Sequence, residues 1–143
     1  MYIDYQKVIK TINFFNSFKH DEIERVISIL KIIHVEEGKT LFQRGHQAVN
    51  CYIVLSGNYM IYYKKGQAFT LHKPGEIIGY TSLMAPFYYT STCVSLTEGE
   101  LILLSRANFY RLVQVNSMLS NKIIEEINKV AEKRQFFTQH MND

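Results

Sequence analysis

The stretch Gly75-Glu76-Ile77-Ile78-Gly79-Tyr80-Thr81-Ser82-Leu83-Met84 decides the fold of this chain. Pro74 and Gly75 make a bend, two β-branched residues follow, and Gly79 opens a polar turn. When such a turn lies in a β-barrel, its backbone N–H groups can point into the cavity and hold an anion. Two glycines four residues apart also fit an ordinary barrel turn, so the surrounding segments must decide between the two interpretations.

Short runs of β-branched and aromatic residues lie on both sides of this stretch. They cover residues 32–35, 40–42, 51–55, 59–63, 69–71, 77–78, 92–96 and 101–104. Turn residues separate them, as in Glu37-Gly38, Arg44-Gly45, Ser56-Gly57-Asn58, Lys65-Gly66 and Glu98-Gly99. Many short strands at this spacing predict a sandwich or barrel rather than alternating strands and helices.

The two ends of the chain have a helical period. Apolar residues recur every three to four positions over residues 5–30, where Asp21 and Glu24 have the spacing of a capping box. Ser105 is placed to cap a short helix that runs through residue 115, and Asn116 or Ser117 to cap a second, long helix.

The long C-terminal helix carries a heptad-like apolar seam, in which a single arginine interrupts the apolar residues. Such a stripe is typical of a helix that pairs with another helix. We therefore expect a homodimer whose interface consists of Ile123, Ile127, Val130, Arg134 and Phe137.

Length, charge and hydropathy exclude several classes of protein. The 143 residues are enough for one domain with a real core. No apolar run is long enough for a membrane span, and the N-terminus lacks the layout of a secretion signal, so we expect a cytoplasmic protein without a membrane partner. The net charge of +3 is mild, and lysines and arginines never cluster beyond two in a row. This chain therefore does not present a DNA-binding surface.

No pattern of reactive residues indicates a metal site, a cofactor or catalysis. Cys51 and Cys93 lie in apolar strand-like runs and show no CxxC spacing, which indicates buried reduced thiols. The histidines have no ligand spacing, and the chain contains neither HExxH nor GxSxG. We therefore expect no metal, no cofactor and no enzymatic activity.

The order of these segments resembles the cyclic-nucleotide-binding domain. Four stretches carry the resemblance: 35–45, 52–59, 71–79 and 109–116, the last of which resembles the helix before the long helix of the Crp/Fnr branch. The resemblance implies a mainly β fold with flanking helices, namely a double-stranded β-helix, or jelly roll, followed by a long C-terminal helix. Residues 1–116 would form the effector-binding domain and residues 117–143 the dimerisation helix.

Two charged residues of the family's phosphate-binding cassette are missing here. The family pattern places a glutamate after the cassette glycine, and this chain has Tyr80. It places an arginine at the far end of the cassette, and this chain has Phe87 or Tyr89, depending on the register. A buried phosphate without a cationic partner loses its charge-assisted contacts. The resemblance therefore implies a sensor for an effector other than cAMP.

The same segment is rich in tyrosines and hydroxyl groups. An aromatic cavity with a few polar groups suits a small planar or anionic ligand, and an arginine on the long helix of such a domain could supply the missing charge. Alternatively, the aromatic residues fill a closed pocket, and the arginine extends to solvent. The candidate ligand-binding residues are Gly79, Tyr80, Thr81, Ser82, Tyr88, Tyr89, Thr90, Ser91 and Arg134.

The resemblance implies a regulatory function. We expect the effector-sensing half of a Crp/Fnr transcription regulator, a homodimer that would contact DNA only through a domain absent from this chain. The alternative is a stand-alone module that acts through protein partners. An enzyme of the cupin type is a remote third, because a cupin would need a cluster of metal-binding histidines on its strands.

Overall fold

The computed structural model describes the chain over residues 5–10 and 12–139, and its side chains over 7–9 and 12–134. Along the chain the elements are α1 (Tyr5–Lys10), η1 (Asn13–Phe15), α2 (His20–Ile27), β1 (Leu30–Val35), β2 (Thr40–Phe42), β3 (Asn50–Ser56), β4 (Tyr59–Tyr62), β5 (Ala68–Leu71), β6 (Ile77–Ile78), η2 (Tyr80–Ser82), β7 (Thr92–Ser95), β8 (Gly99–Ser105), α3 (Arg106–Val115) and α4 (Ser117–Gln139). The predicted succession of helices, short strands and helices is confirmed.

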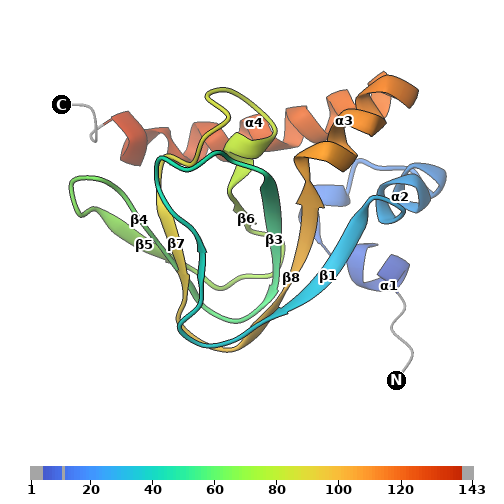
Figure 1. Ribbon diagram of the computed structural model, residues 1–143. Coiled ribbons are helices and arrows are strands. Elements are labelled where there is room, and N and C mark those ends of the chain that lie inside the picture. Colours follow the sequence, from blue (N-terminus) through green and yellow to red (C-terminus); the bar gives the residue numbers. More distant parts are fainter. Residues whose placement is uncertain (1–4, 11, 140–143) are drawn as a thin grey trace.

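Within the described residues, the strands form two antiparallel four-stranded sheets. One sheet has the order β1-β8-β3-β6 and the other β2-β7-β4-β5. Strands distant in sequence are neighbours, since β1 pairs with β8 and β2 pairs with β7. The two sheets curve around a common interior, and α4 runs across one end of the roll (Figure 1). The mainly β jelly roll with a C-terminal helix is therefore confirmed.

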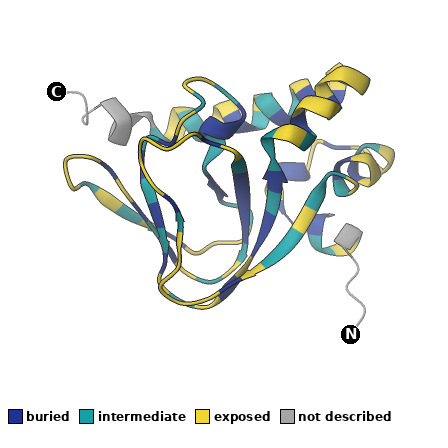
Figure 2. Cartoon of the chain, in the orientation of Figure 1, coloured by how far each residue is buried: buried dark blue, intermediate teal, exposed yellow. Residues whose placement is uncertain are grey.

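Strand β3 shows how the core is divided. Side chains alternate between the two faces of a strand, and here both faces are buried (Figure 2). Tyr52 and Val54 belong to the apolar cluster between the sheets, and Cys51 and Ile53 to a second cluster beneath the helices. A strand that is covered on both faces has a continuous apolar sequence rather than an alternating one. This explains the sequence Cys-Tyr-Ile-Val-Leu at 51–55.

The apolar stripe of α4 is buried within the chain itself. Ile123 and Ile127 are each 1% exposed, and they belong to the same cluster as Phe14 of η1 and Cys51 of β3. Val130 is partly buried against that cluster, and Phe137 lies outside the described side chains. The sheet has an apolar outer face that α4 covers. In this conformation Ile123 and Ile127 are thus not available for the predicted dimer interface.

Helix caps confirm part of the sequence analysis. The N–H of Asn108 donates to Ser105 Oγ (3.1 Å), and that of Leu119 donates to Asn116 Oδ1 (3.1 Å), so Asn116 rather than Ser117 supplies the side-chain acceptor for α4. The predicted box at Asp21 and Glu24 is wrong, because α2 begins at His20 and the Glu22 carboxylate accepts the N–H of Lys19 (2.9 Å).

One further result concerns membranes. In the part of the chain that the structure describes, no helix is both long enough and apolar enough to cross a bilayer.

Candidate effector site at the cassette turn

The turn after β6 depends on glycine at position 79. Its φ of 75° lies in the left-handed region, and a Cβ there would stand 3.1 Å from the Asn50 carbonyl oxygen and 3.2 Å from the Phe42 and Tyr89 rings. Only glycine therefore fits without strain. The short helix η2 follows, and the Ser82 hydroxyl donates to the Gly79 carbonyl oxygen (2.9 Å). The hydroxyl of Ser82 thus stabilises the turn rather than facing a ligand.

Tyr89 is fixed inside the cassette. Its ring stacks on Phe42 with the centroids 3.9 Å apart and the planes 13° apart. Its hydroxyl donates to the Asn50 carbonyl oxygen (2.8 Å) and accepts the Asn50 N–H (3.1 Å). The side chain is 4% exposed, and burial raises the pKa of Tyr89 to about 12, so the phenol is neutral at physiological pH.

The structure distinguishes the two residues that could replace the family's arginine. Phe87 has a positive φ of 66°, and its ring lies under the Arg106 guanidinium, 4.7 Å from Cζ to the ring centroid. Tyr89, by contrast, lines the interior beside Gly79. Tyr89 therefore takes the inner position, and Phe87 packs against a surface arginine.

Arg134 forms the opposite wall from α4. Its Cζ lies 5.8 Å from the Tyr80 ring centroid and 5.7 Å from that of Phe69, which are cation–π distances. Burial disfavours the charged form of both side chains, so it lowers the pKa of Arg134 and raises the pKa of Tyr80. Among the described residues, no carboxylate lies within 4.0 Å of its guanidinium. The arginine is thus a largely desolvated charge whose contacts are aromatic rings.

The space enclosed by these residues is very small. The cavity measures about 20 Å³, whereas a single water needs roughly 10–15 Å³. It brings together most of the predicted ligand-binding set, but neither Ser82 nor Tyr88, whose side chain is 49% exposed. The predicted residues that line it are Gly79, Tyr80, Thr81, Tyr89, Thr90, Ser91 and Arg134. In this conformation the aromatic side chains fill the pocket.

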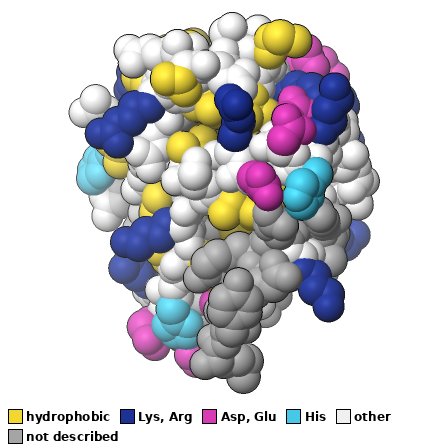
Figure 3. Space-filling view, turned by 90° about the vertical axis from the view of Figure 1, so that its right-hand side faces the viewer, with side chains coloured by type: hydrophobic (Ala, Val, Ile, Leu, Met, Phe, Trp, Pro, Cys, Tyr) yellow, Lys and Arg dark blue, Asp and Glu magenta, His cyan; other side chains and the backbone are white. Residues whose placement is uncertain are grey.

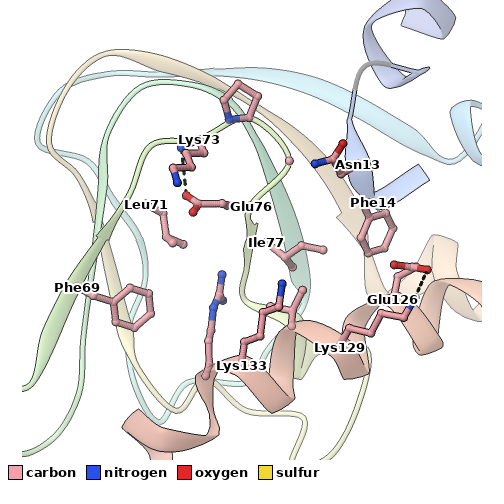
Figure 4. A pocket seen from close by; sticks show the side chains of 14 residues that line it. Asn13, Phe14, Phe69, Leu71, Lys73, Glu76, Ile77, Glu126, Lys129 and Lys133 are labelled. Carbon is pink, nitrogen blue, oxygen red and sulfur yellow. Dashed lines mark hydrogen bonds and ion pairs between the residues drawn. The ribbon is translucent and has the colours of Figure 1, made fainter. Parts of the chain in front are cut away.

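Two larger hollows flank this closed pocket. One of about 420 Å³ lies between the cassette and α4. The other, of about 550 Å³, lies between η1, β5, the bend at 73–77 and α4 (Figure 4). The sequence analysis missed Lys73, Lys129 and Lys133, which line the second hollow. The only sequence signal was that Lys129 and Lys133 are four residues apart on one helix face.

A small polar cluster lies on the surface at the ends of two strands. It consists of His34 near the end of β1, Glu36 just after β1 and Glu98 just before β8. His34 Nε2 lies 2.8 Å from Glu98 Oε1 and 3.5 Å from Glu36 Oε1. All three side chains are exposed. Exposed contacts of this kind contribute little to stability. The sequence did not predict this cluster, because Glu98 is distant along the chain from His34 and Glu36 at the end of β1.

One protein-family model matches more than half of this chain. The model of the cyclic nucleotide-binding domain matches residues 32–116. The cAMP-dependent protein kinase type II regulatory subunit of Drosophila melanogaster is 23% identical over 119 residues, which are 83% of this chain and 31% of that protein. The chain therefore spans about a third of the length of this curated relative.

Two solved structures share the fold. The regulatory subunit of a cAMP-independent protein kinase A from Trypanosoma brucei has a TM-score of 0.80 at 16% identity, over 95% of this chain and 48% of that one. The N-terminal domain of a transcriptional regulator from Streptomyces coelicolor has a TM-score of 0.69 at 22% identity, over 88% of this chain and 93% of that one.

Proposed function

This chain belongs to the cyclic nucleotide-binding domain family, and we propose that it is a sensor domain for a small effector other than cAMP. The observation that carries the proposal is Tyr89. We take Tyr89 to stand where the family pattern places a cationic partner for the phosphate; its hydroxyl is hydrogen-bonded to the Asn50 backbone in both directions. A domain with this cassette keeps the family's fold and its regulatory role while the phosphate position is closed.

Two energetic costs oppose the binding of a cyclic phosphate in this pocket. A cyclic phosphate in this pocket would lack its arginine partner, and loss of one side of a buried charge pair costs about 3–5 kcal/mol. That penalty corresponds to roughly two to three decades in affinity. The phosphate would also have to displace the Tyr89 ring from Phe42 and leave Asn50 without its hydroxyl partner. Arg134 cannot replace the cassette arginine without leaving the rings of Tyr80 and Phe69.

Two regulatory settings fit the domain. The first is the sensor half of a Crp/Fnr transcription regulator, supported by the likeness to the Streptomyces coelicolor regulator and by the succession of α3 and the long α4. On the face shown in Figure 3, basic side chains are scattered among acidic and neutral ones. In a regulator of this kind, DNA contact would be made by a separate domain.

The second setting is a stand-alone module that acts through protein partners. It is favoured by the burial of Ile123 and Ile127 inside the chain, which removes the main argument for a helical dimer seam. A homodimer would then need other residues of α4. The Drosophila melanogaster relative is, by its name, the regulatory subunit of a protein kinase, which fits a module that acts through another protein.

Isothermal titration calorimetry with cAMP and cGMP tests the central proposal. We expect no dissociation constant at or below the low micromolar range for the wild type, even with millimolar nucleotide. A Tyr80→Glu/Tyr89→Arg variant supplies the two missing charges and is the matched comparison. Tight wild-type binding would refute the proposal, because it would show that the cassette opens and that backbone donors suffice.

A further inference from the structure

We propose that the hollow between α4 and the bend at 73–77 is a binding site for an amphipathic organic anion, a molecule with an apolar body and one carboxylate or sulfonate group. The inference deepens the proposed function and rests on it, because it gives the effector a place outside the closed cassette pocket. The two pockets are separate cavities that share Arg134 as a wall.

The size and lining of the hollow suit an organic molecule. Its volume of about 550 Å³ falls in the range of roughly 300–1,000 Å³ that is typical of small-molecule sites. Phe69 and Leu71 of β5 lie on one side, Phe14 of η1 on the other, and Ile77 of β6 between them (Figure 4). Val130 of α4 adds a further apolar surface. These side chains would contact the apolar body of the ligand.

The charges around the hollow favour an anion. Its lining has four basic residues and two acidic ones. Glu126 pairs with Lys129 (3.0 Å). The Glu76 carboxylate accepts the backbone N–H groups of His72 (3.0 Å) and Lys73 (3.1 Å), but it keeps its negative charge and attracts Arg134 electrostatically. The remaining basic side chains therefore leave uncompensated positive charge in the hollow.

Among the described residues, three basic side chains of the hollow form no close ion pair. Within the described part of the chain, no carboxylate lies within ion-pair distance of Lys73, Lys133 or Arg134. Figure 4 shows the Lys133 side chain rising from α4 toward Ile77. A carboxylate or sulfonate beside these groups would gain charge-assisted hydrogen bonds, next to apolar walls that weaken solvent screening.

The hollow on the other side of the cassette has the opposite character. Its described lining includes Tyr80, Thr90 and Asn128, and its one charged group is Glu132. A carboxylate ligand would be repelled there. The two hollows are of comparable volume, so charge rather than size assigns the anion to the hollow beside Lys133.

Arg134 connects the proposed site to the cassette turn. Its guanidinium contacts Phe69, which lines the hollow, and Tyr80, the first residue of η2. An anion that draws the guanidinium toward the hollow weakens its contact with Tyr80. Ligand binding would thus reach the cassette turn and α4 together, which gives the domain a way to report the effector through two elements.

Fluorescence titration with 1-anilinonaphthalene-8-sulfonate, an aromatic sulfonate, tests the site, and 1-naphthoate serves as a non-fluorescent competitor. A Lys73→Gln/Lys133→Gln variant removes two cations from exposed positions, so the fold is retained. We expect its dissociation constant for either probe to rise about tenfold, since a partly exposed ion pair is worth a factor of a few. The matched control is Lys39→Gln/Lys65→Gln, which removes the same charge from two exposed turns outside the lining of the hollow. It should change binding less than twofold, because charges exposed to solvent are screened.

Each other outcome overturns the inference. Equal weakening in both lysine pairs means that net charge alone attracts the probes, and absence of binding to the wild type means that the hollow takes no such anion. If Tyr80→Ala abolishes binding and the Lys73/Lys133 pair does not, the ligand lies in the cassette. That last result would contradict the site proposed here but not the proposed function. Tight cAMP binding by the wild type would contradict the proposed function but would not test the binding of these probes.

Discussion

Replacing Tyr89 with phenylalanine tests whether the cassette is held closed by its own side chain. The change keeps the ring that stacks on Phe42 and removes only the hydroxyl. That hydroxyl donates to the Asn50 carbonyl oxygen and accepts the Asn50 N–H, at 2.8 and 3.1 Å. The variant therefore isolates two hydrogen bonds between the cassette and β3.

The expected loss of stability follows from those two bonds. A neutral hydrogen bond contributes about 1 kcal/mol net, and a buried backbone group left without a partner costs about 1–3 kcal/mol. Because both Asn50 backbone groups lose their partner hydroxyl, we expect Tyr89→Phe to lower the free energy of unfolding by about 2 kcal/mol. For a domain of this size that corresponds to a fall of about 7 °C in Tm.

Urea and thermal unfolding, followed by circular dichroism, measure this loss. Tyr88→Phe is the matched control, because the neighbouring ring is 49% exposed and surface substitutions usually change stability by less than about 0.5 kcal/mol. If Tyr89→Phe unfolds at the same urea concentration as Tyr88→Phe, the hydroxyl does not hold the cassette. The argument that Tyr89 closes the phosphate position would then fail.

Two further predictions concern α4 and alkaline pH. Ile127→Asp should unfold the domain, at a cost of at least about 4 kcal/mol, because it places a charge in the core. Met118 is 79% exposed on the same helix, so Met118→Asp should be neutral. If light scattering instead shows that Ile127→Asp is folded but dissociated, the stripe is a dimer seam. Burial raises the pKa of Tyr59, Tyr63 and Tyr89 to about 12, and unfolded phenols ionise near pH 10. Stability should thus be full below about pH 10 and fall toward pH 12, and equal urea midpoints at pH 8 and pH 11 would contradict this.

Local chemistry in the sequence determined the helices and strands, and it also carries the prediction of an altered cassette. Alternating apolar residues and turn residues such as Gly79 act over a few neighbours, so the strands and the helix cap at Ser105 were predictable one by one. The loss of the cassette charges at Tyr80, and at Phe87 or Tyr89, was predicted from position relative to the cassette glycine, and it stays a prediction. The exposed lysines on α4 were visible too, but without any indication of what lies opposite them.

Tertiary structure alone decided which surfaces meet. The apolar stripe through Ile123 and Ile127 could be buried equally well against a second helix or against the outer face of a sheet, because the hydrophobic effect is non-directional. In the structure it packs against the sheet. The hollow beside Lys133 joins η1 to α4, over a hundred residues apart along the chain. No local pattern specifies such a contact, since only the closure of the whole roll brings those segments together.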